Sequence, residues 1–317
     1  MQVKDENEYE DLLAEWADLE SGLGIILSHP DSSQQFAQRV LQYDRWMQGL
    51  LLRDQDAGLY LLFQLASNSP VGYSASHALV CAVLCHLIAH ELQLPPKERD
   101  SLVRAALTMN VAMTQMQDVL ATQTERPNPA QQEMIRLHPV RSAMMLGSMG
   151  VQDENWLEVV GNHHDNQPEV GDFRTIAPVV RLTRVLKTVD RYAAMISPRL
   201  SRAGRSATES ARAVMANGAD RSDEIGQALM RVVGLCPPGT FVRMDSDELG
   251  VVLRRSAQPN LPDVAIVGTA DGQLLRSPRL HATARALPRI RSALAASSVR
   301  AQLNHYQVLC LSTQAVA

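Results

Sequence analysis

The chain has 317 residues, of which 45% are hydrophobic, and a formal net charge of −4 with a pI near 6.1. That length suits one large or two ordinary domains with a sizeable core. Because there is no overall basic excess, a nucleic acid duplex is not expected as the main partner. The first twenty residues contain eight acidic residues and only Lys4 as a base, which is unlike a secretory leader.

Hydropathy and cysteine usage indicate a protein of the cytoplasm. No uninterrupted apolar run approaches the ~20 residues that span a bilayer, so no membrane contact is expected. The four cysteines are Cys81, Cys85, Cys236 and Cys310, and none forms a CxxC pair. We expect them to be buried free thiols, as is usual in a reducing compartment.

The N-terminal third is predicted to be helical. Aromatic residues make up only 4% of the chain, a composition that favours helices over a β-sandwich. Apolar residues recur at helical spacing at Leu12, Leu13, Trp16, Leu19 and Leu23, opposite an acidic face. This amphipathic helix is expected to pack on a partner surface, and a homodimer through the N-terminal helices is one form of that prediction.

Further helices follow in close succession. Asp31 opens a helix start signal for a second helix that runs towards Arg53. A third helix reaches Ala66, where the segment SNSPVGYS ends it with Pro and Gly. The apolar spacing then predicts helices at 75–93, 97–108, 130–148, 153–165, 175–196, 206–217 and 221–234.

The periodicity changes after GLCPPGT at 234–240. The segments FVRM, LGVVLRR and DVAIVG are typical of strands, and 270–273 (ADGQ) is typical of a hairpin turn. A last helix is predicted from Leu287 to Leu303. The chain therefore divides into an N-terminal helical region at 1–68, a helical domain at 69–235 and a C-terminal β-containing tail with a final helix at 236–317.

Metal-ligand residue types recur along the predicted bundle. Pro139 is expected to break or kink its helix and so to aim the preceding histidine into a site. A carboxylate on the core-facing stripe of the 175–196 helix is costly unless it is paired or binds metal. Each residue alone also fits a satisfied core histidine or a buried ion pair. The set, which could converge on a transition metal, is His77, His138, His163, His164 and Asp190.

In this order the motifs resemble the HD-GYP family, the bacterial branch of the HD-domain phosphohydrolases. The resembling segments, in chain order, are 73–95 for the first-histidine helix, 135–146 for the HP segment, 159–165 for the histidine pair, 179–199 for the helix of the metal-binding aspartate, and 233–255 for the tail. The resemblance implies a mainly α fold: an HD-domain-like helical bundle with an N-terminal helical extension and a small C-terminal β-containing appendage. It also implies a two- or three-metal centre that cleaves cyclic di-GMP with a metal-activated hydroxide.

The chain departs from the family at the chemically central positions. Met109 and Asn110 stand where the family has its His-Asp pair, and Met113 stands where it has a lysine. Asp165 replaces a glutamate, and NQPEVGDF replaces the glycine-tyrosine-proline loop. Because asparagine is a poor bridge between cations and methionine removes a nitrogen ligand, the two-metal clamp on the reacting oxygens is lost. Loss of the lysine removes a charge for phosphate.

The surviving residues imply a reduced metal centre. His138, His163 and His164 could form a three-histidine site, which is a valid arrangement for one ion with a water ligand. His77 and Asp190 are then expected to pair directly. The resemblance therefore implies one divalent transition metal ion at most, iron, manganese or zinc, and the alternative is none.

A basic stretch lies beside these ligands. Between Arg181 and Arg205 there are seven basic residues and only one acid, Asp190. The stretch is either a binding surface for an anionic ligand or a solvated helix face. Arg199 aligns with an arginine common in the family, so it is the first choice for a phosphate contact, with Arg202 beside it.

Three functional hypotheses follow. The first is a degenerate HD-GYP-like protein of bacterial cyclic-dinucleotide signalling that binds a cyclic dinucleotide, another phosphorylated ligand or a protein partner, with little or no phosphodiesterase activity. The second is a single-metal phosphohydrolase or phosphodiesterase. The third is a non-catalytic interaction module resembling HDOD domains. Stoichiometric metal separates the second from the third, and nucleotide binding without turnover favours the first.

Overall fold

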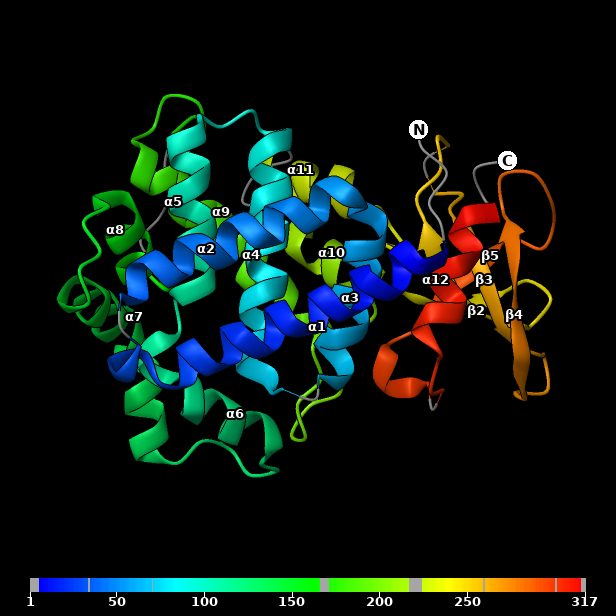
Figure 1. Ribbon diagram of the computed structural model, residues 1–317, viewed down its shortest axis with the longest axis horizontal. Helices are drawn as coiled ribbons and strands as arrows, with labels where there is room; N and C mark the ends of the chain where they lie inside the picture. The colour runs from blue at the N-terminus through cyan, green and yellow to red at the C-terminus, as the bar shows by residue number, and fades with distance from the viewer. Residues whose placement is uncertain are drawn as a thin grey trace.

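A computed structural model describes residues 6–33, 35–69, 71–165, 171–216, 224–258, 260–299 and 301–314. A bundle of helices forms most of the molecule, and a five-stranded sheet with the last helix lies at one end (Figure 1). The α-helices are α1 (Glu6–Ser28), α2 (Phe36–Arg53), α3 (Gln55–Asn68), α4 (Tyr73–Glu91), α5 (Pro96–Thr108), α6 (Thr114–Thr122), α7 (Pro129–Ser148), α8 (Glu154–Asn162), α9 (Pro178–Ile196), α10 (Ala207–Ala216), α11 (Glu224–Val233) and α12 (His305–Gln314). This mainly helical architecture with a small C-terminal sheet confirms the predicted fold class.

The N-terminal helices pack within their own chain. Leu12, Trp16, Leu19 and Leu23 are all buried, and α1 lies against α2 and α4. The apolar stripe that was predicted to contact a partner surface is therefore covered by the protein's own bundle. α2 begins at Phe36, later than the start signal at Asp31, which instead lies in a short 3-10 helix.

Helix α4 is the centre of the bundle. Residues 74–89 are buried without interruption, because α1, α3, α5, α9 and α11 all pack against it. Tyr73–Glu91 is long and apolar enough to pass as a membrane span, but 89% of its most apolar window is buried inside the protein. Its apolar surface is thus covered by neighbouring helices, and His77 and His86 on this helix are buried.

Helix α7 continues through Pro139, so the predicted break is wrong. Its N-terminus is fixed by a capping box, in which the Asn128 side chain accepts from the Gln131 amide and the Gln131 side chain accepts from the Asn128 amide. The proline leaves one carbonyl without its helical donor. That carbonyl accepts a hydrogen bond from the His138 side chain instead, and α7 is continuous from Pro129 to Ser148.

The C-terminal segment forms an antiparallel sheet in the order β4-β3-β2-β1-β5. Its strands are β1 (Phe241–Met244), β2 (Leu249–Arg254), β3 (Asp263–Gly268), β4 (Leu274–Ala282) and β5 (Ile290–Ala293). The three predicted strands and the hairpin between β3 and β4 are confirmed. The helix predicted at 287–303 is wrong: residues 290–293 pair with the otherwise open edge of β1, and the last helix begins only at His305.

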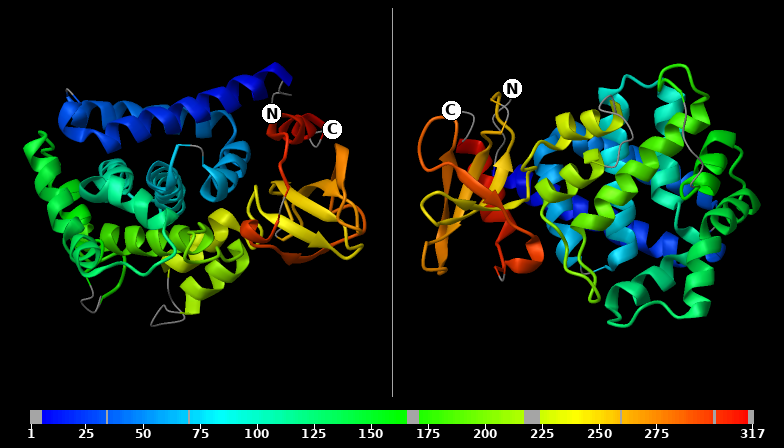
Figure 2. Two further views of the ribbon diagram at one scale, coloured as in Figure 1. Left: turned by 90° about the horizontal axis from the view of Figure 1, so that it is seen from below. Right: turned by 180° about the vertical axis from the view of Figure 1, so that it is seen from behind.

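Two ion pairs attach the sheet to the bundle. Arg254 and Arg255 on β2 and just after it pair with Asp54 and Asp56 at the start of α3. At Gly239 an added Cβ would lie 2.5 Å from the Tyr60 carbonyl oxygen of α3, so the close approach requires glycine. The start of α1 and the last helix, α12, both lie at this end of the molecule (Figure 2). The metal-ligand candidates lie on the bundle helices α4, α7 and α9 and just after α8.

Candidate metal centre

His138 is fixed by the proline that follows it. Because Pro139 has no amide hydrogen, the Ile135 carbonyl lacks its normal helical donor. The Nδ1 atom of His138 lies 2.6 Å from that carbonyl oxygen. A carbonyl can only accept, so Nδ1 carries the proton and, in the neutral ring, Nε2 carries the lone pair. The sequence signal HP thus sets a tautomer that presents Nε2 to the bundle interior.

His163 is fixed in the same way at the end of α8. The predicted helix at 153–165 ends earlier, at Asn162, so both histidines of the pair lie at its C-terminus. Terminal carbonyls of a helix lack amide donors. The Nδ1 atom of His163 donates to the Val160 carbonyl oxygen at 2.7 Å. Its Nε2 atom is therefore the acceptor in the neutral ring.

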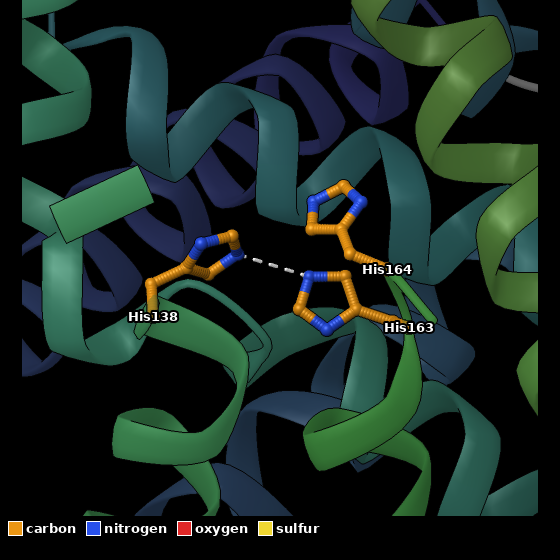
Figure 3. Close-up of side chains that lie close together, drawn as sticks. All are labelled: His138, His163 and His164. Atoms are coloured by element: carbon orange, nitrogen blue, oxygen red, sulfur yellow. Dashed lines mark hydrogen bonds between the residues drawn. The ribbon is translucent and has the colours of Figure 1, made fainter. Parts of the chain in front are cut away.

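The two Nε2 atoms face each other at 3.1 Å (Figure 3). Desolvation by burial is the main cause that lowers the pKa of His138 to about 4 and that of His163 to about 3. At neutral pH both rings are neutral, so two lone pairs meet in a buried place. A cation between them resolves that repulsion, and histidine ligands that donate Nδ1 to a backbone carbonyl are usual at metal sites. The donor pair fits a metal ion.

His164 completes a group of three. Its ring centroid lies 4.4 Å from that of His163 and 5.1 Å from that of His138. One ring nitrogen from each histidine lies within 4.8 Å of the others. His164 is exposed while the other two are buried, so this group opens to solvent on one side. The structure brings together the three histidines that the sequence predicted as one site.

His77 and Asp190 form a second group, from α4 and α9. His77 Nε2 lies 2.8 Å from Asp190 Oδ1, which is the direct pairing predicted from the sequence. A third donor lies beside them, because Cys81 Sγ is 3.6 Å from His77 Nε2. The potential ligand atoms of these three residues also lie within 4.8 Å of one another.

The charges of the two groups are coupled. Burial acts to raise the pKa of Asp190, but the hydrogen bond with His77 and the charges of His77, His163 and His164 outweigh it and hold the pKa well below its usual value. Asp190 is thus an anion at neutral pH. Burial, with the nearby Asp190 charge, raises the pKa of the Cys81 thiol well above its usual value, so without a cation Cys81 is a neutral thiol.

Met109 and Asn110 are the positions that the sequence predicts to replace the family's His-Asp pair. Met109 and Asn110 follow the last residue of α5, a helix that packs against α4, α8 and α9. Met109 is 1% exposed and part of the hydrophobic core. Met113 is also buried, in the short 3-10 helix that packs on α7. Apolar side chains therefore occupy the junction among the helices that carry the candidate ligands.

Comparison with known proteins agrees with this arrangement of helices and histidines. The sequence profile of the HD domain matches residues 61–224, more than half of the chain. The chain belongs to the HD-domain family. The resemblance seen in the sequence is confirmed at the level of the HD-domain phosphohydrolases, and HD domains typically bind divalent metals, for which this HD domain has two candidate ligand groups.

Two known proteins are similar to this chain, one in sequence and one in fold. A cyclic di-GMP phosphodiesterase of Pseudomonas aeruginosa is 26% identical over 211 residues, which are 65% of this chain and 49% of that protein. The chain therefore spans about half the length of that relative. An HDG"Y"P protein from Bdellovibrio bacteriovorus shares the fold with a TM-score of 0.50 and 12% identity, over 68% of this chain and 69% of that chain.

The basic stretch of this HD domain is largely engaged by its own protein. Arg181 forms a two-pronged ion pair with Glu98, at 2.6 and 2.7 Å. Arg202 donates to the Ala194 carbonyl at the end of α9. Arg199 donates to the Tyr73 hydroxyl at 3.0 Å. These contacts favour the interpretation of a structural face for part of the stretch.

Arg199 is connected to the metal-ligand candidates through an aromatic stack. Its guanidinium carbon lies 4.7 Å from the centroid of the Tyr73 ring, and the Tyr73 ring stacks on His77 with centroids 5.4 Å apart. The Arg199 Nε atom is buried and has no hydrogen-bond partner within the described parts of the chain. Arg199 thus contacts Tyr73, which in turn stacks on His77.

Two residues of this neighbourhood were missed by sequence reasoning. Cys81 was read as an ordinary buried thiol, although its spacing of four from His77 places both on one helix face. Tyr73 gave no signal, because aromatic stacking across a bundle depends on tertiary placement. The segment that replaces the glycine-tyrosine-proline loop lies at 166–173, and residues 166–170 are outside the described residues.

Proposed function

We propose that this HD domain holds one divalent transition metal ion at His138, His163 and His164 and binds a cyclic dinucleotide or related phosphorylated ligand beside it, with little or no hydrolysis. The observation that carries the proposal is the pair of Nε2 atoms 3.1 Å apart, each with its Nδ1 hydrogen bonded to a carbonyl. When bound, the ion supplies a Lewis acid that attracts phosphate oxygen. Iron and zinc suit imidazole ligands, whereas manganese more often has oxygen ligands.

Little turnover is expected because the junction beside the site is apolar. Cleavage by two closely spaced ions needs ligands that hold both, and an aspartate bridge supplies charge to each. Here Met109 and Asn110 offer a thioether and a neutral amide. The buried Met113 offers no cation for phosphate. The proposed role is therefore that of a degenerate HD-GYP-like signalling protein of the bacterial cytoplasm, which responds to a ligand and passes the signal to a protein partner.

The ligand class rests on relatives and on charge. The Pseudomonas aeruginosa relative is named for its action on cyclic di-GMP. Arg199 and Arg202 lie at the end of α9, and Arg199 packs beside the His77 group through Tyr73. We propose both arginines as ligand-binding residues. Because the loop that names the HD-GYP family is replaced, binding should be weak and should fall as salt rises.

A second candidate function is favoured by the exposure of His164. A three-histidine site that faces solvent can keep an open coordination position, which is the arrangement of catalytic single-metal sites. A single-metal phosphohydrolase acting on a different phosphoester is the enzyme that this would support. It needs no bridging aspartate.

One set of measurements separates these functions. Metal content and cyclic di-GMP binding and turnover are measured for the wild type, His163→Ala and Arg199→Ala, with Arg184→Ala as a control in the same basic stretch. The proposal expects metal that is lost in His163→Ala, and salt-sensitive nucleotide binding that falls in Arg199→Ala without turnover. Metal-dependent turnover abolished by His163→Ala would favour the enzyme. Absence of both metal and nucleotide binding would favour the HDOD-like interaction module.

A further inference from the structure

We propose that Cys81 is a thiolate ligand that, together with His77 and Asp190, forms a second metal site suited to zinc or cobalt. The three side chains bring a nitrogen, a sulfur and an oxygen within 4.8 Å of one another. His77 and Cys81 come from α4, and Asp190 comes from α9. This inference goes beyond the proposed function, which requires only the three-histidine site, and it revises the expectation of a single ion.

The spacing on α4 sets the first two donors. Residues four apart lie on the same face of a helix, one turn above the other. Cys81 Sγ lies 3.6 Å from His77 Nε2. Bonds of about 2.3 Å to sulfur and about 2.0–2.1 Å to nitrogen, at a tetrahedral angle, separate two such donors by roughly 3.6 Å. The sulfur and the nitrogen are therefore already at the separation that one ion requires.

Asp190 supplies the third donor from the facing helix. Its Oδ1 atom is 2.8 Å from His77 Nε2, a hydrogen-bond distance. To share an ion, the two atoms must move apart by roughly half an ångström, since tetrahedral zinc separates its nitrogen and oxygen donors by about 3.4 Å. The Asp190 side chain is 17% exposed and so is the more accessible residue of the His77–Asp190 pair. A water molecule or a ligand atom can take the fourth position there.

The chemistry of the donors selects the ion. A soft thiolate with one imidazole and one carboxylate suits zinc or cobalt rather than magnesium or calcium. On binding, the thiol proton of Cys81 leaves to solvent and the sulfur bonds the ion. His77 is 2% exposed, and its Nδ1 atom has no hydrogen-bond partner among the residues that the structure describes. The direct His77–Asp190 hydrogen bond is then the state of this group without metal.

The next cysteine on the same helix is a matched control. Cys85 is as deeply buried as Cys81, with 0% exposure, and lies one turn further along α4. It is not a member of the group that surrounds His77. A structural role for buried thiols would make Cys81 and Cys85 equivalent, whereas the proposed site makes them differ.

The test uses the full chain stripped of metal and titrated with cobalt(II) alone. The wild type should develop the near-ultraviolet absorption of thiolate-to-cobalt charge transfer. Cys81→Ser should lose that absorption, whereas Cys85→Ser and Cys236→Ser should keep it. His163→Ala should also keep it, because the three-histidine site contributes no sulfur. If His163→Ala loses nucleotide binding but keeps the absorption, the result bears on the proposed function alone and leaves the Cys81 site supported.

Folding of each variant is checked by far-ultraviolet circular dichroism and thermal melting. If Cys81→Ser fails to fold, the site is tested instead in His163→Ala loaded with one equivalent of zinc. X-ray absorption at the zinc edge should then show one sulfur neighbour at about 2.3 Å. The inference is overturned if no thiolate absorption or sulfur neighbour is found, or if either persists in a folded Cys81→Ser protein.

Discussion

At the scale of single residues, the amide hydrogen that Pro139 lacks leaves a backbone carbonyl free to orient a histidine of the three-histidine group. Pro139 withholds the amide that would occupy the Ile135 carbonyl, and His138 uses that carbonyl to fix its tautomer. His163 uses a helix-terminal carbonyl to the same end. In both histidines the hydrogen bond is made by Nδ1, on the opposite side of the ring from Nε2, the candidate ligand atom. Such a hydrogen bond orients the imidazole for metal binding.

The first prediction concerns Pro139. In Pro139→Ala a new amide donor competes for the Ile135 carbonyl, so His138 loses its fixed orientation. We expect affinity for metal at the three-histidine site to fall by about 10-fold, at the lower end of the usual effect of such outer partners. The helix itself should be unchanged or more stable. Zinc competition titration measures the affinity, with Val140→Ala, an exposed neighbour on α7, as control. Equal affinity in both variants would contradict the argument.

A second residue-scale prediction concerns pH. Desolvation by burial, followed by the charges of His90 and Arg99, lowers the pKa of His86 to about 4. An unfolded histidine titrates near ~6.5, so between about pH 6.5 and 4 the unfolded chain binds a proton that the folded protein does not. This group therefore destabilises the fold as pH falls through that window, by up to about 1.4 kcal/mol per pH unit.

His86→Leu should remove this contribution and flatten the acid side of the stability curve. The measurement is the free energy of unfolding in urea at several pH values between 4 and 7. His29→Gln, which changes an exposed histidine, is the control. The same slope in His86→Leu and the wild type would show that His86 is not the titrating group.

At the scale of elements, the proposed lack of turnover depends on the junction after α5. α5 packs against α4, α8 and α9, and the 3-10 helix that follows packs on α7. Every helix that carries a candidate ligand thus meets this junction. Methionine and asparagine there leave a well-packed and poorly coordinating centre, since Met109 is fully in the core.

The third prediction is a partial gain of function at this junction. Met109→His with Asn110→Asp should tighten metal binding, because it adds a nitrogen ligand and a carboxylate between the two groups. Cyclic di-GMP turnover should rise slightly above that of the wild type. Adding Met113→Lys should raise it further if phosphate positioning is limiting. The rate and metal content of the three proteins are compared, with Met113→Leu as a control for repacking. Unchanged metal affinity in a folded double variant would count against the assignment of these positions.

At the scale of the whole molecule, the sheet is held to the bundle by charge as well as by apolar contact. The Asp54 side chain is 4% exposed and pairs with Arg254, which is 16% exposed. Asp54 also caps α3 by accepting from the amides of Asp56 and Ala57. One buried carboxylate therefore joins the start of a bundle helix to the second strand of the sheet.

The fourth prediction tests that junction. Asp54→Asn keeps a capping oxygen but leaves the Arg254 charge without its buried partner, which typically costs about 3–5 kcal/mol. Urea unfolding should show a loss of that order, and the metal sites should keep their affinities. Glu15→Gln, which breaks the exposed pair with Arg53, should change stability little. If the two variants behave alike, the Asp54–Arg254 pair does not hold the sheet in place.

The sequence by itself determined most helices of the bundle, three of the five strands and the order of the candidate ligands. Helical spacing gave the bundle, the period change after residue 240 gave β1 to β3, and the series from His77 to Asp190 gave the family. Each of these is a local pattern, because the helix and strand periods depend only on near neighbours in the chain. Two predictions made from local patterns alone were wrong. Pro139 does not break α7, and residues 290–293 form a strand within the helix predicted at 287–303.

Only the tertiary structure decided how those residues act together. It placed Cys81 beside His77 and Asp190, stacked Tyr73 between His77 and Arg199, and buried the α1 stripe within its own chain. It also set the Nε2 atoms of His138 and His163 at 3.1 Å. These relations join residues far apart in the chain, and they depend on side-chain direction and on desolvation, which arise only when helices pack against one another.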